Sequence, residues 1–192
     1  MKRFSTYVFA LVAIAALGAC GHNKGAISAN SSAPDWVNRG SGAFKDEGGK
    51  PVFYGVGIVD NVRSLSLAVE TGDDRGRAAI AKIMNSYVTS LAKSYESSVS
   101  AGDPSKISEE QMVSQTSKVF TQFQLHGALP VNHWVDRSDA AHPIYYSLIK
   151  LDMSAIQNSL DQSKELDAKV RDYVKANAEK AFDELSAEQA KH

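Results

Sequence analysis

Residues 52–59 are Val52-Phe53-Tyr54-Gly55-Val56-Gly57-Ile58-Val59, a stretch rich in β-branched and aromatic side chains, which predicts a β-strand. Successive side chains of a strand point to opposite faces, so Gly55 and Gly57 lie on the same face. Two glycines on one face leave bare backbone, which allows another element to approach closely. We therefore expect a helix to cover the glycine face of this strand.

The following segment, from Ser64 to about Ser97, has the periodicity of a long helix. Two glycines, Gly72 and Gly76, each cost about 1 kcal/mol inside a helix. Two interpretations compete. The helix runs through, and its glycines approach the glycines of the strand; or it breaks after Thr71, which then caps a second helix. We favour the single helix, with or without a kink.

Further elements follow along the chain. A turn is expected at 46–50, where two glycines stand together. Ser108 and Gln111 form a capping box, which predicts a helix over about 109–120. The period then changes to two over 122–135, which predicts one strand, or two collinear strands interrupted at Gly127 or Pro130.

The remaining chain predicts a hairpin loop at 138–141, a strand over 143–151 and a final long helix over 153–188. The second half of this helix is rich in Ala, Glu and Lys. Its apolar stripe either packs along its own domain or pairs with another copy as a coiled coil, which would make a homo-oligomer.

These elements have the order β-α-α-β-β-α and predict the α+β class. We expect a small three-stranded, largely antiparallel sheet with helices packed on one face, plus a long C-terminal helix. The expected domains are a signal peptide (1–19), a flexible tether (20–33), an α+β domain (34–152) and the helix (153–192).

The composition restricts the function. The 192 residues contain 21 basic and 22 acidic side chains, so no basic excess exists to neutralise phosphates, and no nucleic-acid partner is expected. A hydrophobic content of 43% fits a globular core. The one cysteine excludes an internal disulfide and a multi-cysteine metal site.

That cysteine follows the layout of a bacterial secretion signal. Lys2 and Arg3 precede an apolar run over 7–17, which is about half the length that a spanning helix needs. Small residues then lead to Ala19 and Cys20. This arrangement resembles the lipobox of bacterial lipoproteins, which implies cleavage between Ala19 and Cys20 and a lipid on the Cys20 sulfur. The alternative is an ordinary signal peptide with an incidental cysteine.

The resemblance to a lipobox implies a location. Two or more acyl chains give stable membrane attachment, at about 0.8 kcal/mol per buried methylene. Gly21 stands where an Asp would favour the inner membrane in many enteric-type bacteria. We therefore expect a lipid-anchored outer-membrane protein of the bacterial cell envelope, with the inner membrane as the less favoured location. The tether that follows spans about 20 Å.

Four short segments resemble the Lpp-twenty lipoprotein family. They are Pro34-Asp35-Trp36-Val37, Tyr54-Gly55-Val56-Gly57-Ile58, Arg77-Ala78-Ala79-Ile80-Ala81, and the pairing of 131–136 with 145–149. The resemblance covers about 34–151 and implies an envelope lipoprotein, similar to domains of flagellar outer-membrane assembly proteins, with no catalytic constellation. The chain departs from the family in Gly72, in Asp73-Asp74 and in its charged C-terminal helix.

Several side chains could bind a metal or transfer a proton, at positions where structural roles also explain them. His126, His133 and His142 are candidate zinc or copper ligands, although an unbroken strand would place His126 and His133 on opposite faces. Asp73-Asp74, and Asp136 with Asp139, are carboxylate pairs at positions where Asp also has local structural reasons to occur.

Gly55 and Gly57 fail the dinucleotide fingerprint, because Asp60 stands where it requires glycine. No Gly-x-Ser-x-Gly nucleophile motif occurs in the chain. Trp36 and Trp134 are candidate anchors of a partner surface, with a core position as the more common alternative.

The sequence thus predicts a lipid-anchored, non-catalytic binding or structural module of the envelope. No cofactor or metal is expected. The expected partners are the membrane, through lipidated Cys20, and another envelope protein or peptidoglycan. The alternatives are a regulator of peptidoglycan synthesis, a flagellar assembly factor, and, from another class, a metal-binding protein or hydrolase that uses the histidine-bearing hairpin.

Overall fold

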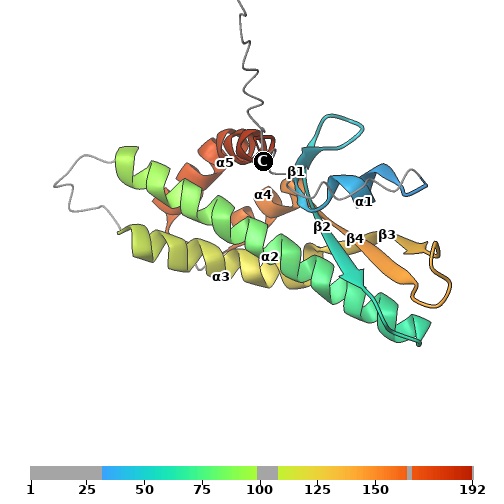
Figure 1. Cartoon of the computed structure of the whole chain (residues 1–192). Helices are drawn as coiled ribbons and strands as arrows, with labels where there is room; N and C mark the ends of the chain where they lie inside the picture. The colour runs from blue at the N-terminus through green and yellow to red at the C-terminus, as the bar shows by residue number, and fades with distance from the viewer. Residues whose placement is uncertain (1–31, 99–107, 164–165, 192) are drawn as a thin grey trace, which may run out of the picture.

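The structure is a computed structural model that describes residues 32–98, 108–163 and 166–191 (Figure 1). Ala19 and Cys20, the rest of the predicted signal peptide, and the predicted tether as far as residue 31 lie outside the described residues.

Nine elements follow one another along the described chain. They are α1 (Asp35–Arg39), β1 (Gly42–Lys45), β2 (Pro51–Val59), α2 (Leu65–Ser98), α3 (Glu109–Gly127), β3 (Leu129–Asp136), β4 (Ile144–Asp152), α4 (Met153–Gln162) and α5 (Ala168–Gln189). The strands form one antiparallel sheet in the order β1-β2-β4-β3. The α+β class is confirmed, and so are β2, β4, the hairpin between β3 and β4, and the long helix α2.

The sheet has four strands rather than the three expected. The added strand, β1, pairs with the first half of β2 through the predicted turn. Within that turn the Asp46 carboxylate accepts hydrogen bonds from the backbone N–H groups of Gly48 and Lys50, at 2.9 and 2.8 Å. The turn was predictable from its residues, whereas β1 has only four residues and owes its conformation to pairing with β2.

The helices form a layer on one face of the sheet (Figure 1). The long α2 lies across β2 and β4, α3 packs against α2, and α5 packs against both α2 and β1. The short α1 lies over the opposite face, where the Arg39 guanidinium stands 4.5 Å from the ring centre of Phe44 and 5.8 Å from that of Tyr54. The expectation that helices cover one face therefore holds for the large helices and not for α1.

Facing glycines bring α2 and β2 together at backbone distance. A Cβ atom added to Gly57 would lie 1.8 Å from the backbone oxygen of Gly72, and one added to Gly55 would lie 2.1 Å from that of Gly76. The helix runs unbroken through both of its glycines. The interpretation of a single helix is thus confirmed, because close contact with the strand requires glycine on both sides of the interface.

Three aromatic rings form the centre of the core between the sheet and the helices. Phe53 of β2 packs edge-on against Tyr87 of α2 and Phe182 of α5, with ring centres 5.6 and 5.3 Å apart. The Tyr87 hydroxyl donates a hydrogen bond to the Ala178 carbonyl at 2.9 Å, which links α2 to α5 inside the core. A buried hydroxyl needs such a partner, because an unpaired one costs about 1–3 kcal/mol.

We expect Tyr87→Phe to lower the stability by about 1 kcal/mol at neutral pH, since it removes this hydrogen bond. Burial raises the pKa of Tyr87 above the ordinary tyrosine range. The folded state therefore keeps a proton that the unfolded chain releases above about pH 10. This contribution to stability is complete below that pH and is lost as the pH rises.

Urea unfolding between pH 7 and 11 tests this dependence. The Tyr87→Phe variant should lose less stability than the wild type on the alkaline side. Tyr54→Phe, at a half-buried ring on the sheet surface, serves as the control and should keep the wild-type alkaline loss. Parallel curves for the wild type and Tyr87→Phe would contradict the assignment.

The predicted boundary between the second helix and the strand after it is wrong. Residues 122–127 continue α3 instead of starting a strand. Phe120, Phe123 and Gly127 also recur at helical steps, and a short alternation does not distinguish the helical period from the strand period. The start of α3 is as predicted. The backbone N–H of Ser108 donates to Gln111 Oε1, and that of Gln111 donates to Ser108 Oγ, so the capping box is formed.

The C-terminal helix is divided into α4 and α5. Its second part begins at Ala168, and the carboxylate of the preceding Asp167 caps it by accepting a hydrogen bond from the Lys169 N–H at 2.9 Å. This division lets α5 run back along α2 and β1. The apolar stripe of α5 is buried within the same chain, at Val170, Val174, Ala178, Ala181 and Phe182. The coiled-coil alternative assumed that this stripe had no partners within its own chain, and the structure supplies such partners.

Candidate binding surface

The two edges of the sheet differ in what covers them. At β1, Gln189 of α5 accepts a hydrogen bond from the backbone N–H of Ala43 at 2.7 Å, so this edge is capped by the chain itself. At β3, the first five residues are exposed, and the side chains of Leu129 and Val131 keep 59% and 50% of their surface in solvent. The register shifts between Pro130 and Asn132, and this irregularity hinders the pairing of a further strand with the edge.

A row of three apolar side chains crosses the sheet on the face opposite α2. Ile58, Tyr146 and Trp134 are register partners on β2, β4 and β3, and we call them the aromatic row. The rings of Trp134 and Tyr146 are 5.3 Å apart, and Ile58 is 49% exposed. Partial burial and the negative charge of Asp136 raise the pKa of Tyr146. Exposed apolar groups in a contiguous row are typical of protein interaction surfaces.

The two tryptophans therefore have different positions. Trp134 is half-buried in the aromatic row, where it remains accessible to a partner. Trp36 lies in α1 and is only 8% exposed, and its indole nitrogen has no hydrogen-bond partner in the described chain. The structure thus places Trp36 in the interior and leaves Trp134 as the accessible candidate.

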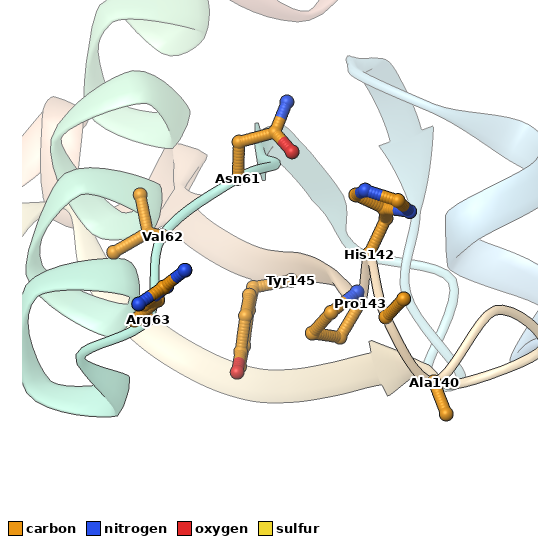
Figure 2. A pocket seen from close by; sticks show the side chains of 8 residues that line it. Asn61, Val62, Arg63, Ala140, His142, Pro143 and Tyr145 are labelled. Carbon is orange, nitrogen blue, oxygen red and sulfur yellow. The ribbon is translucent and has the colours of Figure 1, made fainter.

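A polar hollow of about 460 Å³ opens beside this end of the sheet (Figure 2). One wall is the connection from β2 to α2, residues 61–63, and the other is the hairpin loop, residues 140–143. Tyr145 lies between the two walls, with Arg63 on one side of it and Pro143 and His142 on the other. We call this feature the polar hollow.

The hairpin side of the polar hollow is fixed by Asp139. Its Oδ1 accepts a hydrogen bond from the Ala141 N–H at 2.9 Å, and its Oδ2 lies 3.0 Å from His142 Nδ1. The hydrogen bond from His142 is the main reason why the pKa of Asp139 is lowered, followed by that from Ala141. The carboxylate is therefore an acceptor, and Nδ1 of His142 carries the proton that it receives.

A smaller hollow of about 200 Å³ shares Tyr145 with the polar hollow. Its lining is mostly apolar and includes Leu65 and Val69 of α2 and Val135 of β3. Leu65 is 58% exposed, so the start of α2 adds to the apolar surface at this end of the sheet.

The candidate metal ligands are not brought together. His133 Nε2 lies 2.8 Å from Asp73 Oδ1 and thereby joins β3 to α2, whereas His142 is bound to Asp139 in the loop. His126 belongs to α3, not to a strand, and its side chain lies outside the described residues. Within residues 32–98, 108–163 and 166–191, no group of three or more His, Cys, Asp or Glu side chains is placed to hold a metal ion.

The carboxylate pairs have local structural partners. Asp74 forms an ion pair with Arg77 at 3.2 Å, while Asp73 is bound to His133. Asp136 Oδ1 accepts from the Ser138 N–H at 2.8 Å and so stabilises the hairpin turn. These contacts occupy the carboxylates individually, so neither pair has the shared environment of an acid–base couple.

One arrangement resembles the parts of a serine hydrolase. Ser147 is the register partner of His133, which is bound to Asp73. However, Ser147 is only 2% exposed and packs against Gly72, and in the described chain no hydrogen bond joins it to His133. Acyl transfer requires an accessible nucleophile in contact with its base, which this geometry does not provide.

Comparisons with known proteins gave no match to a family model, to a curated protein or to a solved structure. None of the described helices has the length and apolar character needed to span a membrane. The resemblance to the Lpp-twenty lipoprotein family therefore stays a prediction.

Sequence reasoning missed the residues that define this end of the sheet. Tyr145 and Tyr146 were predicted within a strand but were not considered as site residues. Adjacent aromatic residues in a strand put one ring on each face, which is a signal that both faces are used. By contrast, no sequence pattern joins Asn61–Arg63 to the distant hairpin loop.

Proposed function

We propose that this protein is a lipid-anchored lipoprotein of the bacterial envelope, attached to the outer membrane through Cys20, whose α+β domain is a non-catalytic binding module. The observation that carries the proposal is the position of the only cysteine, directly after a positively charged start, a short apolar run and small residues. The resemblance to the Lpp-twenty family supports the same location. Regulation of peptidoglycan synthesis and flagellar assembly are narrower forms of this proposal.

The binding part of the proposal rests on the aromatic row. Ile58, Tyr146 and Trp134 form a contiguous, partly exposed apolar surface, and Tyr146 and Trp134 also line the smaller hollow. Aromatic side chains at such positions dominate the energy of many interfaces. The anchor would hold this surface close to the membrane and so raise its effective concentration for partners in the envelope.

Site-specific photo-crosslinking in cells tests the binding surface. A photoreactive residue in place of Ile58 should give defined adducts with one envelope component, and Trp134→Ala in the same chain should lower the yield about tenfold. The same probe at Lys180, an exposed side chain of α5, is the control. Equal adducts at both positions, or a yield unaffected by Trp134→Ala, would contradict the proposal.

Mass spectrometry of the membrane-purified protein tests the anchor. The expected N-terminal peptide begins at Cys20 and carries the added mass of a diacylglycerol and a further acyl chain. An unmodified thiol at Cys20 would overturn the proposed function.

A further inference from the structure

The polar hollow contains complementary hydrogen-bonding groups that the fold does not use. Arg63 is exposed and has no ion pair or hydrogen bond with the described residues. Asn61 at the other end of the same connection has a left-handed backbone, with φ at 57°. An asparagine tolerates this conformation better than most residues do, and its carboxamide can both donate and accept.

The hairpin wall supplies a directed acceptor. Nδ1 of His142 faces the Asp139 carboxylate, which can only accept, so in the tautomer with a single ring proton that proton is on Nδ1 and Nε2 is an acceptor. Asp139 is itself occupied by this bond and by the Ala141 N–H. Its negative charge is thereby partly compensated within the loop, so it opposes an anion in the hollow less than a free carboxylate would.

Flat apolar surfaces lie between these polar groups. The Tyr145 ring and the Pro143 ring both line the hollow (Figure 2). A cation, a hydrogen-bond acceptor, an amide and flat apolar rings are a combination that fits a sugar. The cation binds a carboxylate, the acceptor takes a hydroxyl proton, and the rings contact the C–H face. The volume, about 460 Å³, is in the range of small-molecule sites.

The charge of Arg63 selects among sugars. The first turn of α2, which follows Arg63, contains no acidic residue. Among the described residues Arg63 forms no ion pair, and a guanidinium without a paired carboxylate favours a ligand that brings one.

We propose that the polar hollow binds a carboxylated sugar, a chemistry present in the bacterial cell-wall glycan, with Arg63 as the residue that selects the carboxylate. This proposal rests on the proposed envelope location, which would place the hollow within reach of that glycan. It assigns a ligand class to a site at the same end of the molecule as the aromatic row.

Titration calorimetry with the full chain, purified in detergent, tests the site with a matched pair of sugars. The probes are N-acetylmuramic acid and N-acetylglucosamine, which differ by the lactyl carboxylate. For a single sugar in an open hollow we expect a dissociation constant of about 1 mM for the acid. The neutral sugar should bind about tenfold more weakly. Sodium lactate, the carboxylate without the sugar, should also bind more weakly than the acid.

Three variants give the matched controls. Arg63→Gln should weaken the acid about tenfold and leave the neutral sugar unchanged, which removes the discrimination. Tyr145→Ala should weaken both sugars. Lys180→Gln, which removes an exposed cation on α5, should change neither. Circular dichroism of each variant verifies that the fold is kept.

The outcomes separate this inference from the proposed function. No heat with the acid, equal affinity for both sugars, or an unchanged preference in Arg63→Gln would overturn the site, even if Cys20 carries its lipid. Conversely, an unmodified thiol at Cys20 would contradict the proposed lipid anchor. A sugar preference measured on the purified chain would still stand. Binding of lactate as tight as that of the acid would reduce the site to a simple carboxylate site and would overturn its assignment to a sugar.

Discussion

Replacement of Gly57 by alanine is expected to abolish the native fold. The added Cβ atom would lie 1.8 Å from the backbone oxygen of Gly72, and backbone cannot rotate away as the end of a side chain does. Relief would require α2 to move off the sheet, which would open the core around Phe53 and Tyr87. The penalty is therefore expected to exceed the usual 1–3 kcal/mol of core overpacking and to reach about 4 kcal/mol or more.

Thermal unfolding followed by circular dichroism checks this expectation. The matched control is Gly48→Ala, because a Cβ at Gly48 would meet its nearest heavy atom, an oxygen of Asp46, at 3.4 Å and the residue does not have a positive φ. The control should change stability by no more than about 0.5 kcal/mol. A Gly57→Ala variant that melts cooperatively within a few degrees of the wild type would show that α2 does not contact β2 as described.

This contact also shows what the sequence could predict. The glycines of β2 recur at the strand period, and those of α2 recur at the helix period, so each pair falls on one face. Matching the two pairs was enough to expect close packing and an unbroken helix. The capping box of α3 was predictable for the same reason, since its partners are three residues apart and the interaction is local.

Features that depend on distant residues were not predictable in this way. The four residues of β1 become a strand because β2 pairs with them on one side and Gln189 caps Ala43 on the other. The division between α4 and α5 follows from where α5 can pack, on α2 and β1, and not from a strong breaker in the sequence. Helix propensity is a weak prior that such tertiary contacts override.

The candidate site shows the same limit. The histidines are close in sequence and were candidate metal ligands. In the fold, His133 instead joins β3 to α2, and His142 orders a loop. The polar hollow instead combines residues 61–63 with residues 140–145, two segments that meet only because β2 and β4 are neighbours. A site formed between elements requires the sheet order, which the sequence pattern alone did not provide.

Replacement of Cys20 by alanine is expected to release the protein from the membrane fraction. The sulfur is the attachment point that the lipobox resemblance implies, and alanine has no atom that can accept the lipid. Each buried methylene contributes about 0.8 kcal/mol, so the loss of two or more acyl chains lowers membrane partitioning by many orders of magnitude. The apolar run at 7–17 is about half of a spanning segment and cannot replace the anchor.

Fractionation of cells by centrifugation, with immunoblotting of pellet and supernatant, measures the shift. Ser28→Ala, which changes one small residue of the tether and keeps Cys20, should stay in the pellet with the wild type. We expect Cys20→Ala to unfold at the wild-type temperature, which would separate loss of the anchor from loss of the fold. A Cys20→Ala protein that remains in the washed membrane pellet in its wild-type proportion would mean that something other than an acylated cysteine attaches the chain there.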